Sequence, residues 1–145
     1  LGCAKGYVLT EFFLRGYTNL VGVDLSEYAI QNAHHLVKDK LLCANALDFI
    51  NNTSEKFDLI IIKEMLPHLR EDEVKSLLLR LCDVTREDGT IYIEIQCSRN
   101  GSDSALIKKF DPTHETLMSK KQWQALLEGV ESSSITHLVY LKDLV

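Results

Sequence analysis

A glycine-rich turn, followed by a carboxylate eighteen positions after its last glycine, constrains the fold of this chain more than any other feature. The turn is LGCAKG at residues 1–6, and the carboxylate is Asp24, which follows the apolar run 19–23. Glycines let a backbone approach a ligand closely, and a carboxylate at a strand end can accept hydrogen bonds from two ribose hydroxyls. A turn, a helix, a strand and a carboxylate in this order indicate half of a nucleoside-binding α/β unit.

Hydrophobic patterns further along the chain extend this unit into alternating helices and strands. We expect helices over residues 6–15 and 26–36 and from 71 and 119 onward, a helical turn over 46–50, and strands over 19–24, 40–44, 57–62, 90–96 and 134–141. Such alternation predicts an α/β fold with a Rossmann-like, mostly parallel sheet and flanking helices. We expect a single domain over residues 1–145. Because a strand normally leads into a glycine turn of this kind, we also expect it to be N-terminally truncated and to lack its first strand.

A polar stretch over residues 97–117 is longer than the usual connection between a strand and a helix. We therefore expect a loop insertion here, with a functional rather than a purely connecting role. Asp88 and Gly89 predict a turn before the strand at 90–96. After the long loop, Ser119 has capping-box spacing and begins a helix in which Trp123 lies at core-packing spacing.

The strand ends predict where a ligand binds. In parallel α/β sheets, ligands bind outside the carboxyl ends of the strands. The glycine turn, Asp24, residues 45–48 and residues 63–68 all follow expected strands. We therefore expect them to converge on one edge of the sheet.

The glycine spacing distinguishes between two adenosine-containing cofactors. Dinucleotide sites usually carry GxGxxG, in which the third glycine lets the helix pack close to a pyrophosphate. Here the turn has Gly2, Ala4 and Gly6, and the third-glycine position is Tyr7. The spacing fits a cofactor without phosphate better than NAD, although an NAD(P)-dependent oxidoreductase and a non-catalytic scaffold of the same fold remain alternatives.

Several segments together resemble a known family. LGCAKG, VGVDLSEYAI, CANALDF and FDLIIIKEMLPHL are similar to successive signatures of the class I S-adenosylmethionine-dependent methyltransferases. The segments GCAKGY, VDLSEYAI, FDPTH and SKKQW also resemble those of bacterial methyltransferases associated with sugar or surface-glycan modification. The resemblance implies S-adenosylmethionine as cofactor and methyl transfer to oxygen or nitrogen of a small-molecule or glycan-like acceptor.

The same resemblance implies which residues bind the cofactor. They are Gly2, Ala4 and Gly6 beside the methionine and ribose, Asp24 on the ribose hydroxyls, Leu25 on the adenine, Asn45 and Ala46 at the adenine edge, and Lys63 and Glu64 beside the methionine moiety. Ala4 departs from the usual glycine, which is tolerable where its backbone angles are ordinary. Asp48 is expected either to cap the helical turn that follows or to contact the cofactor.

Two histidines are candidates for acid–base chemistry. Methyl transfer is an in-line displacement, and a hydroxyl nucleophile needs a general base to remove its proton. His114, in the DPTH segment of the long loop, is the first candidate, and His68 is the second. Either histidine taken alone is more often an ordinary surface residue than a catalytic one.

Composition excludes several other classes of protein. The net charge of −5 argues against nucleic acid as the main partner. The sequence has no apolar run of membrane-spanning length. Its four cysteines form no CxxC pair, so we expect reduced thiols, a cytoplasmic protein and no metal site.

Overall fold

The structure is a computed structural model that describes residues 1–98, 104–129 and 136–143. The chain forms two compact units, residues 1–52 and residues 53–145. Each unit contains its own parallel sheet, two strands in the first unit and three in the second. The expected α/β organisation, with parallel strands and flanking helices, is therefore present in both units.

The first unit alternates short helices with two strands. Its elements are α1 (Tyr7–Leu14), β1 (Gly22–Asp24), α2 (Glu27–Gln31), the 3-10 turn η1 (Lys38–Lys40), β2 (Leu41–Cys43) and α3 (Ala46–Asn52). Strands β1 and β2 are parallel, and Asp24 lies opposite Cys43. The carboxyl ends of the two strands therefore lie side by side, as the sequence predicted.

Helix α2 is shorter than the predicted helix over residues 26–36. Its start is as expected, because the hydroxyl of Ser26 accepts a hydrogen bond from the backbone N–H of Ala29 at 3.1 Å. The helix ends at Asn32, whose side-chain amide donates to the carbonyl of Tyr28. Asparagine side chains compete for backbone groups in this way, which makes asparagine a poor residue for a helix interior.

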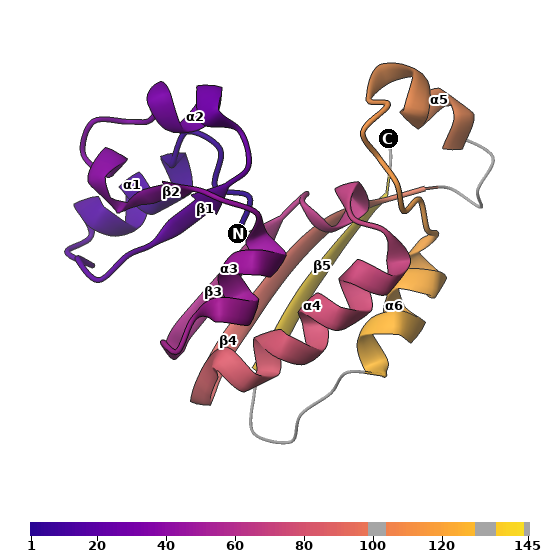
Figure 1. Ribbon diagram of the computed structural model, residues 1–145. Helices are drawn as coiled ribbons and strands as arrows, with labels where there is room; N and C mark the ends of the chain where they lie inside the picture. The colour runs from indigo at the N-terminus through magenta and orange to yellow at the C-terminus, as the bar shows by residue number, and fades with distance from the viewer. Residues whose placement is uncertain (99–103, 130–135, 144–145) are drawn as a thin grey trace. The chain divides into compact units, whose positions relative to one another are not determined.

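The second unit is built on a three-stranded parallel sheet of order β3-β4-β5. Its elements are β3 (Phe57–Lys63), the 3-10 turn η2 (Leu66–His68), α4 (Glu71–Val84), β4 (Thr85–Cys97), α5 (Ser104–Phe110), α6 (Lys120–Glu128) and β5 (Thr136–Asp143). Helix α4 runs across one face of this sheet, and α5 lies beyond the carboxyl end of β4 (Figure 1).

The core of the second unit follows the predicted patterns. Ile91, Ile93 and Ile95 alternate along β4 and are at most 1% exposed. Helix α4 buries its apolar face, which includes Leu77 and Leu81. Trp123 in α6 is fully buried, so the prediction that it packs in the core is confirmed.

Two predictions for the second unit are wrong. The predicted turn at Asp88 and Gly89 is an irregularity inside a longer strand, since Asp88 has φ +63 and the β3–β4 register shifts between Phe57 and Leu59. The predicted loop over 97–117 contains helix α5. Helix α5 has only seven residues, which is too short for a helical period to be recognised in the sequence.

Two further findings concern membrane spans and thiols. Among the described residues, no helix has both the length and the apolar character needed to cross a bilayer. None of the four cysteines, all of which lie in the described part of the chain, forms a disulfide. The single-domain organisation and the cytoplasmic location stay predictions.

Candidate functional site

The glycine turn and the end of β1 are joined through the carboxylate of Asp24. The backbone N–H of Ala4 donates to Asp24 Oδ2 at 2.7 Å, and the backbone N–H of Ser26 donates to Asp24 Oδ1 at 2.8 Å. The backbone N–H of Cys3 also donates to the carbonyl of Val23 at 3.0 Å. Asp24 is thus a structural link between the turn and the start of α2, as well as a candidate ligand-binding residue.

The turn has a left-handed backbone at three alternate positions. Gly2, Ala4 and Gly6 have φ of +66, +47 and +77. The condition that makes alanine tolerable here, ordinary backbone angles, is therefore not met, and a left-handed conformation costs a residue with a Cβ about 1–2 kcal/mol. Such strain persists only where surrounding contacts hold it in place, and here the hydrogen bond to Asp24 does so.

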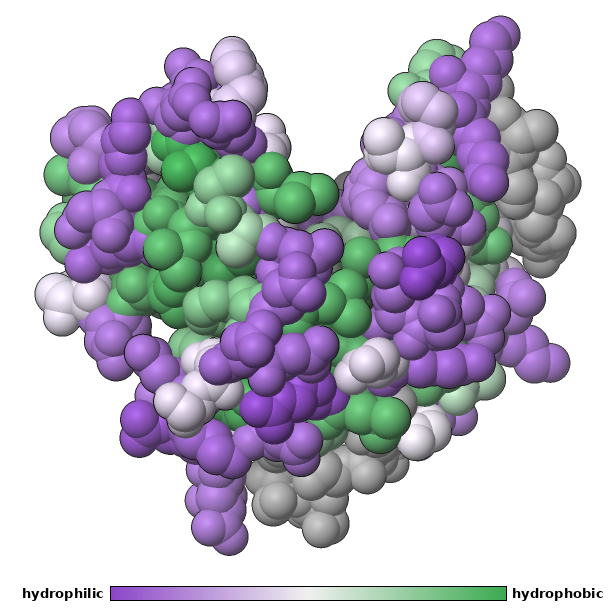
Figure 2. All heavy atoms as spheres, in the orientation of Figure 1, coloured by the Kyte–Doolittle hydropathy of each residue, from purple (hydrophilic) through white to green (hydrophobic). Residues whose placement is uncertain are grey.

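Asp24 retains acceptor capacity for a diol. Each carboxylate oxygen has two lone pairs, and each accepts one backbone N–H here. One acceptor site per oxygen is left, which matches the two adjacent hydroxyls of a ribose. Leu25, the next residue, is 72% exposed and offers apolar surface beside the carboxylate; Figure 2 shows apolar surface among residues of this unit. The residues fit the predicted cofactor at this position.

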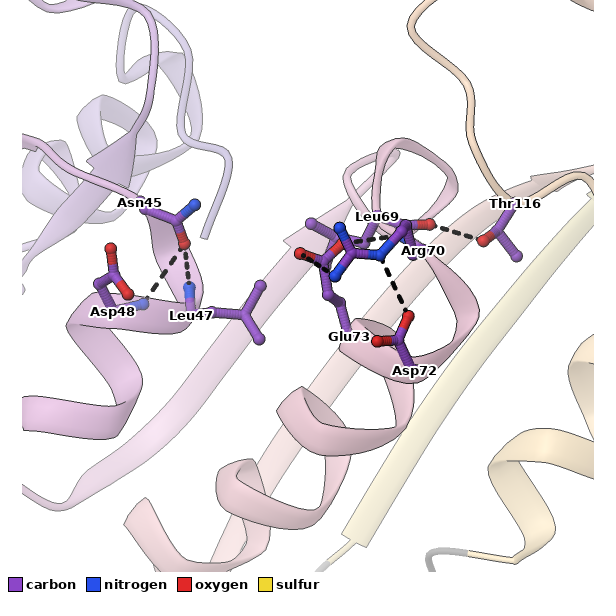
Figure 3. Close-up of polar contacts among 8 residues, drawn as sticks. All are labelled: Asn45, Leu47, Asp48, Leu69, Arg70, Asp72, Glu73 and Thr116. Carbon is purple, nitrogen blue, oxygen red and sulfur yellow. Dashed lines mark hydrogen bonds and ion pairs between the residues drawn. The ribbon is translucent and has the colours of Figure 1, made fainter.

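Asn45 caps helix α3. Its side-chain Oδ1 accepts from the backbone N–H groups of Leu47 at 2.8 Å and Asp48 at 3.3 Å (Figure 3). The possibility that Asp48 is the cap is therefore wrong. The backbone N–H of Ala44 donates to the carbonyl of Asp24 at 3.0 Å. Asn45, the next residue, therefore lies close to the end of β1. The cap uses only the side-chain oxygen of Asn45, so the NH₂ group of Asn45 takes no part in the cap.

Lys63 does not pair with its neighbour Glu64. Its ammonium lies 3.2 Å from Glu94 Oε1 on the adjacent strand β4. The hydroxyl of Tyr92 donates to the other oxygen of Glu94 at 3.1 Å. Lys63 therefore belongs to a polar network along the sheet of the second unit.

Glu64 connects the ends of β3 and β4. Its backbone N–H donates to the carbonyl of Glu94 at 2.9 Å, and its carboxylate accepts the backbone N–H of Gln96 at 2.9 Å. Glu64 has φ of +54, a left-handed conformation for a residue with a full side chain. The two hydrogen bonds hold this strained residue at the carboxyl edge of the sheet.

The two histidine candidates lie against each other. The rings of His68 and His114 are stacked, with centroids 4.5 Å apart and planes inclined by 20°. His68 Nδ1 lies 2.8 Å from the hydroxyl of Thr113, which in turn donates to the carboxylate of Asp111. The hydrogen bonds from Thr113 and the nearby His114 and His68 lower the pKa of Asp111 below its usual value. We refer to His68, Asp111, Thr113 and His114 as the histidine cluster.

Backbone hydrogen bonds fix the loop that carries His114 onto η2. The carbonyl of Pro67 accepts from the backbone N–H groups of Glu115 at 2.9 Å and Thr116 at 3.0 Å. The hydroxyl of Thr116 donates to the carbonyl of Leu69 at 2.6 Å (Figure 3). Sequence analysis did not identify Asp111 and Thr113, because their partner His68 is more than forty residues away in the chain.

The fold and site agree with one protein family. Residues 1–93 match the family described as methyltransferase domain, which is more than half of the chain. The chain therefore belongs to the methyltransferase-domain family. The predicted class I methyltransferase family and the predicted fold are confirmed.

Particular relatives are similar at moderate identity. The chain is 29% identical over 151 aligned positions to EEF1A lysine methyltransferase 2 of Danio rerio, covering 97% of this chain and 64% of that protein. It is 27% identical over 118 positions to phosphoethanolamine N-methyltransferase 3 of Arabidopsis thaliana, covering 78% and 24%.

A solved structure shares the fold. The crystal structure of a SAM dependent methyltransferase from Archaeoglobus fulgidus has a TM-score of 0.67 at 23% identity, covering 89% of this chain and 57% of that one. The chain thus spans less than two thirds of the length of each of these three proteins.

Proposed function

We propose that this chain is the cofactor-binding part of an S-adenosylmethionine-dependent methyltransferase. The observation that carries this proposal is the position of Asp24, whose carboxylate holds the glycine turn and still has one acceptor site on each oxygen. The family indicates the same cofactor. When bound, S-adenosylmethionine supplies a methyl group on a positively charged sulfur.

The first unit is proposed to hold the nucleoside part of the cofactor. Asp24 binds the ribose hydroxyls, Leu25 packs on the adenine, and Asn45 and Ala46 border the adenine edge. The turn residues Gly2, Ala4 and Gly6 are proposed to border the ribose and the methionine moiety. The strained backbone at Ala4 supports this role, since left-handed non-glycine residues cluster at functional sites.

The acceptor is proposed to be a small molecule or a glycan-like compound that presents an oxygen or nitrogen nucleophile. The names of the two relatives describe methylation of lysine and of phosphoethanolamine nitrogen. Both names describe nitrogen acceptors, so amines are to be tested alongside hydroxyls. Acceptor contacts generally come from loops that fold class does not determine.

The histidine cluster is proposed to remove the proton of the acceptor. In the transfer, the acceptor atom forms a bond to the methyl carbon, and the carbon–sulfur bond breaks with its electron pair remaining on sulfur. The acceptor proton leaves toward His114, the predicted general base, which is packed against His68. This assignment is supported by the convergence of two histidines from separate segments at one place.

Calorimetry on the full chain tests the cofactor. We expect S-adenosylhomocysteine to bind and NAD to show no binding under the same conditions. Binding of NAD alone would overturn the proposal in favour of an oxidoreductase, and binding of neither would favour a non-catalytic scaffold. Methyl transfer is then measured with a methyl glycoside, phosphoethanolamine and a lysine peptide as acceptors, each followed by formation of S-adenosylhomocysteine.

A further inference from the structure

We propose that His68, Asp111 and His114 bind one divalent transition-metal cation. One ligand atom from each of these residues lies within 4.8 Å of the ligand atoms of the other two. All three side chains are half-buried, so the site is partly shielded from water. Among the described residues, this is the only group of three or more potential metal ligands that lie this close.

The two imidazoles lie close enough to share one ion once one ring turns. With metal–nitrogen bonds of about 2.1 Å, two imidazoles at neighbouring coordination positions have ring centroids roughly 4.5–5 Å apart. The centroids of His68 and His114 are 4.5 Å apart, but the rings are stacked, so one ring must turn before both nitrogens point to the same ion. Ligand atoms on one ion lie about 3–3.5 Å apart, so the three ligand atoms, that of Asp111 included, must draw closer than the 4.8 Å within which they now lie. The side chain of Asp111 is 44% exposed, which leaves room for that movement.

The donor set defines the class of cation. Two imidazole nitrogens and one carboxylate oxygen favour zinc, cobalt, iron or nickel over magnesium and calcium, which prefer oxygen ligands. Three protein ligands leave at least one coordination position for another molecule, as in catalytic rather than structural sites.

The cluster is held in place before any ion binds. The hydrogen bonds from residues 115 and 116 to Pro67, and from Thr116 to Leu69, fix the DPTH loop against η2. Thr113 contacts both His68 and Asp111 and thus supports two of the three ligands. Partners of this kind orient metal ligands and tune their affinity.

The consequence for catalysis rests on the proposed function. An acceptor hydroxyl occupies the open coordination position of the cation, and the cation stabilises the deprotonated form of that hydroxyl. With the cation bound, the hydroxyl proton passes to water; without it, His114 accepts the proton directly, as proposed above. Of the two acceptor atoms proposed above, such a centre selects oxygen, because a cation repels an ammonium group.

Cobalt titration of the full chain tests the site without an acceptor. We expect one equivalent of Co²⁺ to bind with visible d–d absorption, and Zn²⁺ to displace it. His114→Ala and Asp111→Asn should each weaken binding by more than about 100-fold, beyond the 10–100-fold typical of outer-shell changes. Asp111→Glu, which retains a carboxylate, should bind more tightly than Asp111→Asn.

The chain offers a matched control in the first unit. His34 and His35 are also stacked, with centroids 4.6 Å apart, and they do not belong to a three-ligand group among the described residues. The double variant His34→Ala/His35→Ala should leave cobalt binding unchanged. Loss of binding in this variant, or unchanged affinity in Asp111→Asn and His114→Ala, would overturn the metal site.

Calorimetry with S-adenosylhomocysteine on the same samples distinguishes the two proposals. If S-adenosylhomocysteine binds and Co²⁺ does not, the metal site is wrong and the proposed function remains. If Co²⁺ binds through the three residues and S-adenosylhomocysteine does not, the proposed function fails and the metal site remains. Circular dichroism checks that each variant is folded. If Asp111→Asn does not fold, Asp111→Glu is the second variant that tests the role of Asp111.

Discussion

The backbone N–H of Ala4 donates a hydrogen bond to Asp24 Oδ2 at 2.7 Å. This bond joins the glycine turn to the end of β1 and holds Ala4 in a left-handed conformation. The same carboxylate is proposed to bind the ribose. Strain in the turn and cofactor binding therefore depend on one side chain, and substitutions at the two positions should separate their contributions.

Ala4→Gly should stabilise the first unit or leave its stability unchanged. Removal of the Cβ relieves about 1–2 kcal/mol of left-handed strain, and the greater freedom of glycine in the unfolded chain offsets about 0.4–1 kcal/mol of that gain. The net change in the free energy of unfolding is measured by urea denaturation. A destabilisation of more than about 1 kcal/mol would contradict the strained conformation of Ala4.

Gly22→Ala should destabilise the first unit by roughly 1–3 kcal/mol through overpacking. A Cβ at Gly22 would lie 2.5 Å from Leu41 Cδ2 and 3.0 Å from Cys3 Sγ. The control is Gly16→Ala, where a Cβ meets nothing within 4 Å but φ is +92. Gly16→Ala reports backbone strain alone, so thermal denaturation of both variants separates crowding from conformation. Unchanged stability of Gly22→Ala would contradict the close packing of Gly22 against Leu41 and Cys3.

The thiol of Cys3 should make stability fall at alkaline pH. Burial, and then the negative charge of Asp24, raise the pKa of Cys3 from 9.0 to about 11. In the unfolded chain the thiol ionises near pH 9, whereas in the folded chain it stays protonated to about pH 11. Stability from this group is therefore fully present below pH 9 and is lost as the pH rises toward 11.

Chemical denaturation at a series of pH values between 8 and 11 measures this dependence. Cys3→Ala should remove the part of the slope that Cys3 contributes. Alkylation by iodoacetamide gives an independent measurement, because the thiolate is the reactive form. At pH 9, Cys3 should react more slowly than Cys43, which is exposed. Equal alkylation rates would contradict the raised pKa.

Much of the fold could be predicted because its signals are local. Ile91, Ile93 and Ile95 alternate in the sequence, and the structure buries the same three residues. Ser26 and Ser119 cap the helices that follow them. The end of α2 at Asn32 and the irregularity at Asp88 were missed, because side-chain competition and strand register depend on neighbours that a short window does not contain.

Features of the candidate site were likewise predictable where they depend on local sequence, and were missed where they depend on backbone conformation or on contacts between distant segments. Spacing alone predicted that Asp24 and the glycine turn lie together, and the hydrogen bond from Ala4 to Asp24 joins them. The left-handed backbone of Ala4 was not foreseen, because alanine gives no sign of a positive φ. His68 and His114 were named separately, but their contact depends on hydrogen bonds between distant segments, for example from Thr116 to Leu69.

The affinity of Asp24→Asn for S-adenosylhomocysteine tests the central claim most directly. Asparagine keeps the size of the side chain but removes its charge and one acceptor oxygen. We expect binding to weaken by about 1–3 kcal/mol, the scale of hydrogen bonds to a charged group. Asp39→Asn, at a 78% exposed carboxylate of the same unit, should leave the affinity unchanged. An unchanged Kd in folded Asp24→Asn, measured by calorimetry, would contradict the role of Asp24 in cofactor binding.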